Sequence, residues 1–440
     1  MHRLLRPLAL IPGLLLAQAP NDLTGRWIIT SDYHGTPLYN TMELIQEGDK
    51  LSGQFGGNAL QGNVLEGAAN VGKVHFVAKG QRGNTATFDA TEGGNALSGA
   101  VTFTDADDPE HPETRSFTAS LIPKRREAPS ERHEFTPTVF YRQFSALNKP
   151  VLRVWPGDTI HTTTVDAGGT DEKGRMRVLG GNPETGPFYV ETAAPGDTLV
   201  VRLTRLRLNR DWAISDDALV ERALDSDLAA KMKGTGKGVR WHLDRERGVA
   251  TPEKPGEHLT QYTVPLRPML GCVATAAPPA QAAPPTGDSG RFGGNMDFNE
   301  LAEGATLYLP VSVPGALLYF GDGHAAQGDG ELNGNALETS MDVELTVDVI
   351  ANKRISGPRV ESTTHIMAMG LSGSIDDAFR LATDNMAQWL AEDYKLTPSE
   401  IAQVLGTAAE YRIGEVADRN AGIVVKIAKE RLSSITAPVK

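Results

Sequence analysis

The chain has 440 residues, of which 40% are hydrophobic and 22% charged, and its formal net charge at pH 7 is −12. This length favours more than one domain, and this apolar content is sufficient for packed cores. An acidic chain without clusters of Lys and Arg is a poor nucleic-acid binder, and no stretch beyond the first residues is long and apolar enough to span a membrane. The single cysteine, Cys272, excludes an intrachain disulfide.

The first 19 residues have the pattern of a secretory signal peptide. Arg3 and Arg6 precede a short apolar run, and an Ala-Gln-Ala sequence follows at 17–19. The run is too short for a transmembrane helix, whereas small residues after it are typical of a cleavage site. We therefore expect residues 1–19 to be removed and the mature protein to be periplasmic or secreted.

Residues 20–123 have the pattern of a separate β domain. Short runs of alternating apolar residues are separated by Gly-Asp, Gly-Gly-Asn and Gly-Asn turns, as in antiparallel barrels and sandwiches. Gly25-Arg26-Trp27 and the Leu-Ser-Gly edges at 51–53 and 97–99 resemble small lipocalin-like barrels of exported bacterial proteins. A packing domain and a ligand-binding barrel are both open. The charged segment 124–137 lacks apolar periodicity and is expected to be a linker.

From residue 138 to 440 the chain is predicted to form the main domain. Pro-Gly-Asp turns at 156–158 and 195–197 each precede β-rich sequence, which indicates hairpin strands. Asp166, where the first of these strands ends, is a candidate catalytic carboxylate, although a turn-capping role is equally open. Glu191, on another predicted strand, is a candidate substrate-binding residue, with an ion-paired role as the alternative.

The hydrophobic period changes near Ser374. Apolar residues at helical spacing follow this N-cap residue, and a second helix begins at Thr397, where Thr-Pro-Ser-Glu forms a capping box. We therefore predict an α+β fold, in which a β-rich domain with a helical C-terminal segment follows a small antiparallel β-barrel or sandwich.

Residues 290–338 concentrate the polar chemistry. Two glycine-rich runs flank an apolar segment, 306–320, so a pair of strands would bring two loops full of carboxylates together. Residues two apart on a strand point to one side, so Asp322 and His324 can converge, while Asp297 approaches from the other loop. A mixed Asp/His set suits Zn²⁺, whereas oxygen ligands alone suit Ca²⁺ or Mg²⁺. We expect these three residues to ligate a divalent metal, with zinc favoured and calcium open.

These loops also resemble a known family. The sequences GRFGGNMD (290–297), LYLPVSVPGALLYFGDGHAAQGDGE (307–331), NPETGPFYVETAAPGDTLVVRL (182–203) and RPMLGC (267–272) are similar to the acetamidase/formamidase family, over about residues 150–430. The resemblance implies hydrolysis of the carbon–nitrogen bond of a short linear amide. Six polar residues fall at positions of the family's motif: Asp297, Asp322, His324, Gln327, Asp329 and Glu331.

The chemistry of amide hydrolysis assigns roles to these residues. A metal polarises the carbonyl and lowers the pKa of water, and a carboxylate then transfers a proton to the departing amine. We assign Glu331 as the base, with His324 and Asp166 as further catalytic candidates, and Asn295 and Gln327 as substrate-binding candidates. A serine or cysteine nucleophile is less supported, because this region has no Gly-x-Ser-x-Gly elbow and the lone cysteine has no basic neighbour.

Two functions of different classes follow. The first is an exported amidohydrolase that cleaves linear amides with metal-activated water, expected to be a homo-oligomer without a nucleic-acid partner or membrane span. The second is a non-catalytic ligand-binding protein in which the acidic loops hold a structural Ca²⁺. His324 favours the first, because calcium prefers oxygen ligands.

Overall fold

The computed structural model describes residues 22–56, 63–70, 72–80, 82–279 and 282–435, so the predicted signal peptide at 1–19 lies outside the described residues. The chain divides into two compact units: the first contains residues up to 27 together with 42–121, and the second contains residues 28–41 together with the chain from 122 onward. None of the helices in the described ranges combines the length and the apolar character needed to cross a membrane.

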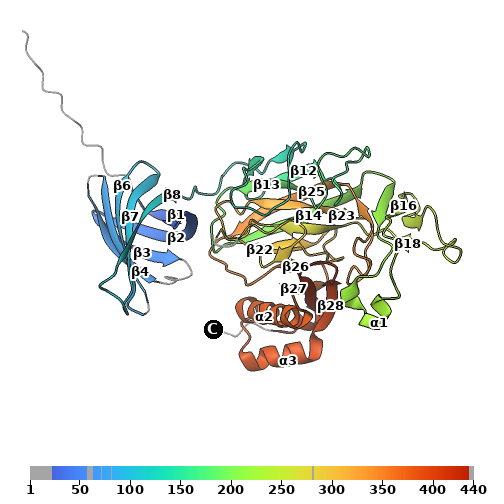
Figure 1. The fold of residues 1–440 in the computed structure, drawn as a ribbon. Helices are drawn as coiled ribbons and strands as arrows, with labels where there is room; N and C mark the ends of the chain where they lie inside the picture. The colour runs from blue at the N-terminus through green and yellow to red at the C-terminus, as the bar shows by residue number, and fades with distance from the viewer. Residues whose placement is uncertain (1–21, 57–62, 71, 81, 280–281, 436–440) are drawn as a thin grey trace, which may run out of the picture. The chain divides into compact units, whose positions relative to one another are not determined.

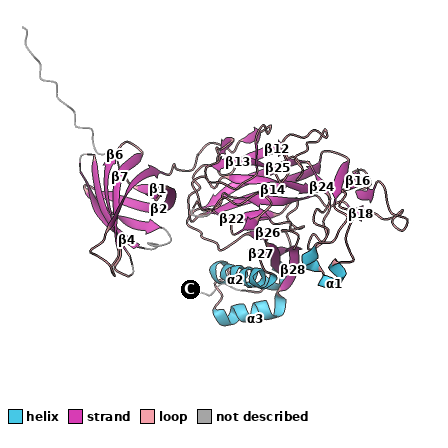
Figure 2. Ribbon diagram, viewed as in Figure 1, coloured by secondary structure: helices cyan, strands magenta, loops and turns pink. Residues whose placement is uncertain are grey.

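The first eight strands of the chain form a closed barrel in which they follow one another in sequence order (Figures 1 and 2). The strands are β1 (Gly25–Tyr33), β2 (Thr36–Glu47), β3 (Lys50–Gly56), β4 (Asn63–Asn70), β5 (Lys73–Lys79), β6 (Thr85–Glu92), β7 (Ala96–Thr104) and β8 (Glu113–Leu121). Buried aromatic rings pack around Phe88: Phe76 stacks on it at 4.5 Å between ring centroids, and Phe117 meets it edge-on at 5.1 Å. The predicted antiparallel β domain is confirmed, with a packed aromatic core. Strand β4 was not predicted, because its Gly and Ala residues have low strand preference.

The larger unit is built on two sheets. The first sheet has the order β18 (Val264–Pro265), β17 (Val249–Pro252), β16 (Val239–Asp244), β15 (Trp212–Ser215), β24 (Glu338–Thr339), β23 (Leu318–His324), β19 (Met269–Ala274), β21 (Gly293–Asn295) and β20 (Ser289–Gly290), with β13 (Glu184–Val190) also beside β23, and β10 (Phe140–Tyr141) and β11 (Leu152–Val154) beside β13. The second sheet has the order β28 (Glu410–Glu415), β29 (Ala421–Ala428), β27 (His365–Ser372), β26 (Arg359–Glu361), β22 (Thr306–Pro310), β14 (Thr198–Leu208), β25 (Met341–Ile350), β12 (Thr159–Thr163) and β9 (Arg132–Glu134).

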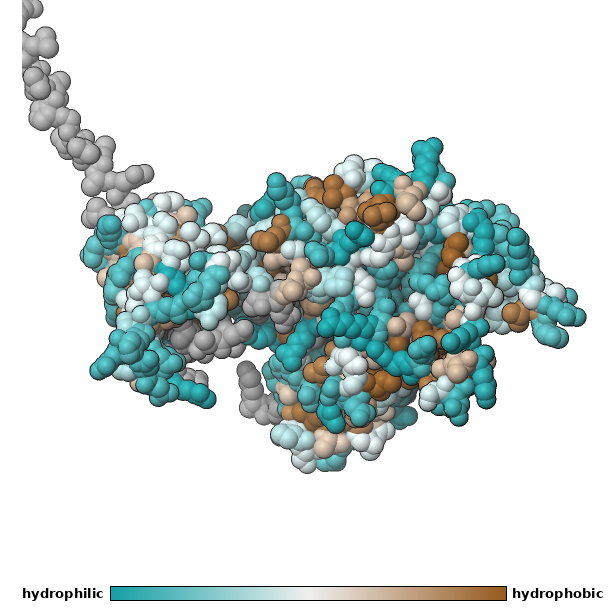
Figure 3. Space-filling view, in the orientation of Figure 1, coloured by the Kyte–Doolittle hydropathy of each residue, from teal (hydrophilic) through white to brown (hydrophobic). Residues whose placement is uncertain are grey.

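One apolar core lies between the two sheets. Phe188 and Phe320 of the first sheet stack at 5.5 Å and share a buried cluster with Val201 and Leu345 of the second. The face seen in Figure 3 is mainly hydrophilic, with apolar side chains in separate areas, in keeping with the net charge of −12. Along β25, buried residues alternate with partly exposed ones, as the alternation of apolar and polar residues in the sequence predicts.

The two Pro-Gly-Asp turns precede strands as predicted, β12 and β14. The carboxylate of Asp158 accepts a hydrogen bond from the backbone N–H of Trp155 (2.9 Å), and that of Asp197 accepts one from Ala194 (2.9 Å). Each aspartate thus closes its own turn three residues back, which is the reason for this residue at this place.

Part of the segment predicted as a linker, 124–137, is built into the larger unit. Strand β9 pairs in parallel with β12. The guanidinium of Arg126 donates to the buried carboxylate of Asp158 at 2.6 Å, and Arg132 donates to Glu344 at 2.7 Å. Backbone pairing and ion pairs therefore hold this stretch in place, and it is not a free tether over that part.

The C-terminal helices α2 (Ile375–Asp393) and α3 (Pro398–Ala408) confirm the two predicted helices, and α2 packs on β27 and β29 (Figure 1). Thr397 and Glu400 form the predicted capping box. The short helices are η1 (Glu221–Ala223), α1 (Ser226–Ala229) and α4 (Lys429–Leu432). After α3 the chain returns to the second sheet as the hairpin β28–β29, which the sequence analysis did not predict. The α+β class is confirmed.

Candidate metal centre

The site forms along strand β23, which is buried over its whole length inside the first sheet. The register places Glu338 of β24 opposite His324, and Asp297 follows β21 by two residues. A Cβ on Gly271 of β19 would lie 2.4 Å from both Oδ1 of Asp297 and Oδ2 of Asp322. Glycine at this position therefore leaves the space in which the two carboxylates meet.

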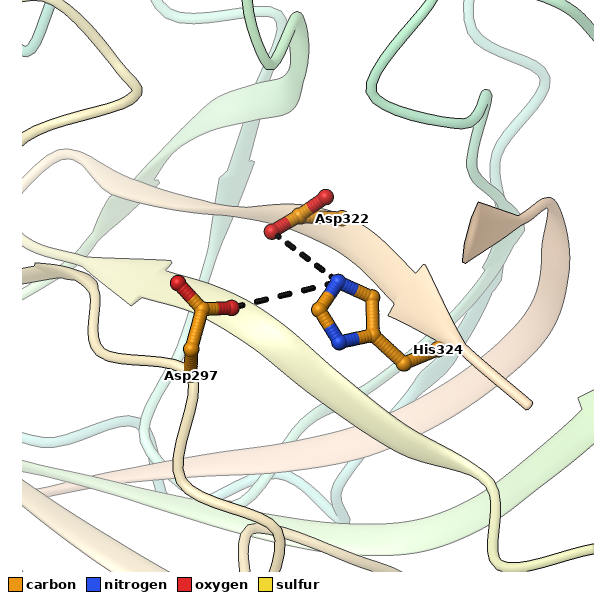
Figure 4. A group of neighbouring side chains, drawn as sticks. All are labelled: Asp297, Asp322 and His324. Carbon is orange, nitrogen blue, oxygen red and sulfur yellow. Dashed lines mark ion pairs between the residues drawn. The ribbon is translucent and has the colours of Figure 1, made fainter. Parts of the chain in front are cut away.

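Asp297, Asp322 and His324 point toward one another (Figure 4). Nε2 of His324 lies 3.5 Å from Oδ2 of Asp322 and 3.9 Å from Oδ1 of Asp297. Oε1 of Glu338 is closer, at 3.1 Å. Glu331 joins them, because carboxylate oxygens of Glu331 and Glu338 and a ring nitrogen of His324 lie within 4.8 Å of one another. We call these five residues the acidic–histidine cluster; all are buried.

Gln327 sets the orientation of the histidine. Its side-chain nitrogen donates to two backbone carbonyls, those of Asp297 (2.5 Å) and Gly414 (3.3 Å). The amide oxygen of Gln327 therefore faces Nδ1 of His324, at 2.8 Å, and accepts a hydrogen bond from the Nδ1–H group. With the hydrogen on Nδ1, the lone pair of the neutral imidazole lies on Nε2, toward the carboxylates.

Burial and mutual repulsion raise the pKa of three carboxyl groups of the cluster. Burial, then Glu331 and Asp322, raise the pKa of Asp297 well above its ordinary value. Burial raises the pKa of Glu331 strongly, and burial with Asp322 raises the pKa of Glu338 to about 7. Burial would lower the pKa of His324, but Glu338 and Asp322 raise it well above its ordinary value. The carboxyl groups can all be ionised together only if a cation joins them.

Several atoms of the cluster lack a hydrogen-bond partner. Within the described residues, Oδ1 of Asp297, Oδ1 of Asp322, Oε2 of Glu338 and Nε2 of His324 are buried and make no aligned hydrogen bond. Burying such an atom without a hydrogen-bond partner costs about 1–3 kcal/mol of folding free energy. Four such atoms close together therefore indicate that a bound group satisfies them. Carboxylate oxygens with one imidazole nitrogen are donors that zinc and related metals accept. The cluster therefore fits a divalent metal, as predicted for its Asp and His residues.

The backbone is strained at three members of the cluster. Asp297, Asp322 and Glu331 have φ values of 40°, 52° and 48°. Non-glycine residues enter this left-handed region at a cost of about 1–3 kcal/mol, and such residues concentrate at functional sites. The surrounding structure thus holds these three residues in backbone conformations that residues other than glycine rarely adopt.

Asp166 is not part of the cluster. Its Oδ2 accepts from Nη2 of the buried Arg210 at 2.7 Å, and its Oδ1 accepts from the backbone N–H of Thr170 at 2.8 Å. Arg210 also donates to the backbone carbonyl of Glu338 (3.2 Å). Asp166 thus closes a turn and neutralises a buried arginine, which is the alternative that the sequence left open.

Glu191 likewise has a structural partner. Its two carboxylate oxygens accept from Nε and Nη2 of Arg153, at 2.6 and 3.0 Å. The guanidinium of Arg153 also lies over the ring of Tyr189, 3.8 Å from its centroid. The ion-paired alternative holds, and the predicted substrate contact of Glu191 has no support in this geometry.

Asn295 and Gln327, predicted to bind substrate, hold members of the cluster. The side-chain nitrogen of Asn295 donates to Oδ2 of Asp297 and to Oδ2 of Asp418, both at 2.6 Å. Its oxygen accepts from Asn182 at 2.9 Å. The amide groups of both residues thus position members of the cluster, and their predicted contact with substrate stays a prediction.

Four further carboxylates, one of them the cluster member Glu338, were not among the predicted site residues; three are buried and Asp418 is partly buried. Glu338 contacts His324 directly. Glu184 has neither oxygen hydrogen-bonded within the described residues and lies over Gly321, where a Cβ would be 2.5 Å from Oε2. Glu415 and Asp418 arrive from the β28–β29 hairpin. Glu184 and Glu338 lie inside sequences that were already singled out, whereas no local pattern marked the other two.

We expect the Glu415→Gln substitution to change the pH dependence of stability. Burial, and then Asp418, raise the pKa of Glu415 to about 8 from 4.5. Between these values the folded protein holds a proton that the unfolded chain has lost, so stability falls as pH rises. Glutamine cannot ionise, so the variant should be more stable than the parent by a few kcal/mol at pH 8 and similar at pH 4. Urea unfolding across this range measures the difference; parallel pH profiles would contradict it.

The chain is similar to known proteins in sequence and in fold. Residues 244–366 match the Acetamidase/Formamidase family model. The acetamidase structure from Bacillus halodurans is 27% identical, with a TM-score of 0.59 over 69% of this chain and 99% of that chain. The acetamidase from Yersinia enterocolitica is 26% identical, with a TM-score of 0.60 over 70% of this chain and 95% of that chain.

A sequence relative is similar over a shorter stretch. The acetamidase of Mycolicibacterium smegmatis is 42% identical over 59 residues, which span 13% of this chain and 14% of that protein. The predicted class, a hydrolase of linear amides, is the one that the names of the family and of these proteins carry. The larger unit of the chain is therefore similar to the acetamidase/formamidase family in sequence over residues 244–366 and in fold over about 70% of the chain.

Proposed function

We propose that the larger unit hydrolyses the carbon–nitrogen bond of linear amides at the acidic–histidine cluster, with the help of a divalent metal. The observation that carries the proposal is the set of buried, unpartnered donor atoms on Asp297, Asp322, His324 and Glu338. The similarity to the acetamidase/formamidase family supports amide hydrolysis as the reaction. A buried cluster of this kind has a large electrostatic cost, which a structural role alone does not explain.

Asp297, Asp322 and His324 would hold the metal, and Glu338 is close enough to join them. When bound, a divalent metal polarises the amide carbonyl and lowers the pKa of water. We favour zinc, because the imidazole of His324 stands at the centre of the donor set. The same imidazole argues against a structural calcium site in a non-catalytic binding protein, since calcium prefers oxygen. Metal analysis of protein prepared without chelators separates the two.

Glu331 is the carboxylate that we propose as the base. Its Oε1 accepts from the backbone N–H of Ala336 at 3.1 Å, which fixes the direction of the side chain. Burial raises its pKa strongly, so it can take a proton from water and return it to the departing amine near neutral pH. Gln327 keeps the ring of His324 in place throughout, because its bonds to two backbone carbonyls do not involve the reacting groups.

A screen of linear amides tests the proposal. The purified protein loaded with zinc should release ammonia from at least one amide of a series that runs from formamide to longer acyl chains. A chelator should stop the release, and added metal should restore it. Folded, metal-loaded protein that releases no ammonia from any amide of the series would contradict the proposed function.

We also propose that the protein is exported, a proposal supported by the sequence of residues 1–19 alone. N-terminal sequencing of protein recovered from its native host should then begin near Pro20. Recovery of a chain that still begins at Met1 would argue against export. Assembly as a homo-oligomer stays a prediction, for which light scattering in solution is the measurement.

A further inference from the structure

The second sheet has an opening beside strand β14. Strand β22 pairs with β14 only as far as Arg202 of β14, which lies opposite Thr306. Strand β14 continues beyond this point and pairs with β25 as far as Leu208. On the side that β22 leaves, the backbone N–H of Leu206 donates to the side chain of Glu303 instead, at 3.0 Å. A cavity of about 900 Å³ lies there, within the usual range for small-molecule sites.

The cavity combines apolar and cationic side chains. Leu206 and Leu208, both buried, line it together with Leu266 and Pro268. Four arginines line it as well, and we call it the arginine pocket for this reason: Arg205, Arg207, Arg245 and Arg267. Side chains of both kinds around one opening suit a ligand with an apolar part and a charged part.

Two of the four arginines carry charges that nearby acids neutralise. Arg205 pairs with Asp342 at 3.1 Å, and Arg207 pairs with Glu303. Arg245 donates to a backbone carbonyl, that of Leu208, at 3.1 Å. Within the described residues, neither Arg245 nor Arg267 forms an ion pair with a carboxylate. Their charges are therefore available to an anion.

The overall charge of the chain makes this pocket unusual. The chain has a net charge of −12, whereas in this pocket Arg245 and Arg267 lie beside buried leucines without an ion-pair partner among the described residues. A guanidinium group binds a carboxylate through two parallel hydrogen bonds. We propose that the arginine pocket binds a small amphipathic carboxylate, whose chain lies on the leucines and whose acid group lies between Arg245 and Arg267.

The pocket is distinct from the acidic–histidine cluster, so the inference goes beyond the proposed amide hydrolysis and does not depend on it. Hydrogen bonds to backbone carbonyl groups nevertheless connect the arginine pocket to the acidic–histidine cluster. The N–H of Arg267 donates to the carbonyl of Ala325 at 2.8 Å, next to His324. The side chain of Asn299, which also lines the pocket, donates to the carbonyl of Gln327 at 3.3 Å.

Calorimetric titration of the full chain with octanoate tests the proposal, with acetate and 1-octanol as probes that lack the chain or the charge. Octanoate should bind, and both other probes should bind at least about tenfold more weakly. The double variant Arg245→Gln/Arg267→Gln should weaken octanoate binding by about tenfold to a hundredfold or more, because charge-assisted bonds are lost. Arg247→Gln is the matched control. Arg247 is exposed and lies two residues from Arg245, so octanoate should bind this variant with the affinity of the parent protein.

Three results would overturn the proposal. These are no binding of octanoate, equal binding of octanoate and 1-octanol, and an affinity that the double variant leaves unchanged. Sedimentation analysis of the same proteins identifies one alternative. If octanoate does not bind and the double variant dissociates an oligomer of the parent, the pocket is a contact between copies of this chain.

Discussion

Replacement of His324 by alanine will remove metal binding and amide hydrolysis together. The imidazole is fully buried, with three carboxylates within 3.9 Å of its Nε2. Without it, the donor set consists of oxygens alone, which binds zinc poorly, and burial then favours the protonated carboxyl groups. Bound metal, measured by mass spectrometry after gel filtration, and ammonia release from the best amide should therefore fall to background.

His161→Ala is the control for this substitution. His161 lies on β12 and contacts Glu134 and Asp342, outside the acidic–histidine cluster, so metal content and rate should stay at parent values. Circular dichroism confirms that each variant is folded, and His324→Gln serves if the alanine variant does not fold. Retention of both metal and normal rate in a folded His324 variant would show that the cluster is not the metal site.

Replacement of Glu331 by glutamine will keep the metal and lose turnover. Glutamine has nearly the same shape and can still accept the hydrogen bond from Ala336, but it cannot take up a proton near neutral pH. Loss of a general base lowers the rate by about 10²–10⁴-fold. Metal content should therefore match the parent while kcat falls within that range and KM changes little.

Glu191→Gln is the matched control for this second result. It makes the same chemical change at a carboxylate that Arg153 binds, so kcat and KM should not change. If Glu331→Gln also loses the metal, Glu331 is a ligand. The base must then be sought among the other buried carboxylates, with Glu184 and Glu338 first, since Asp166 is held by Arg210.

Much of the fold follows from short-range patterns in the sequence. Alternation along 343–349 predicts a half-buried strand, which is found as β25, and Ser374 and Thr397 mark the starts of α2 and α3. These features depend on neighbours within a few residues, where the spacing of side chains is set by backbone geometry. For the same reason, the convergence of Asp322 and His324 on β23 could be predicted, because they are two residues apart on one strand.

The assignment of the other carboxylates depended on partners far along the chain. Asp166 and Glu191 each looked like site residues, but Arg210, 44 residues away, and Arg153, 38 residues away, bind their charges. Conversely, Glu415 and Asp418 reach the site only because the chain returns from α3 to the second sheet as β28–β29. A carboxylate has the same sequence signature whether it binds a metal, caps a turn or pairs with an arginine. Its role is decided by which charges and how much water surround it, and sheet pairing over long sequence distances sets both.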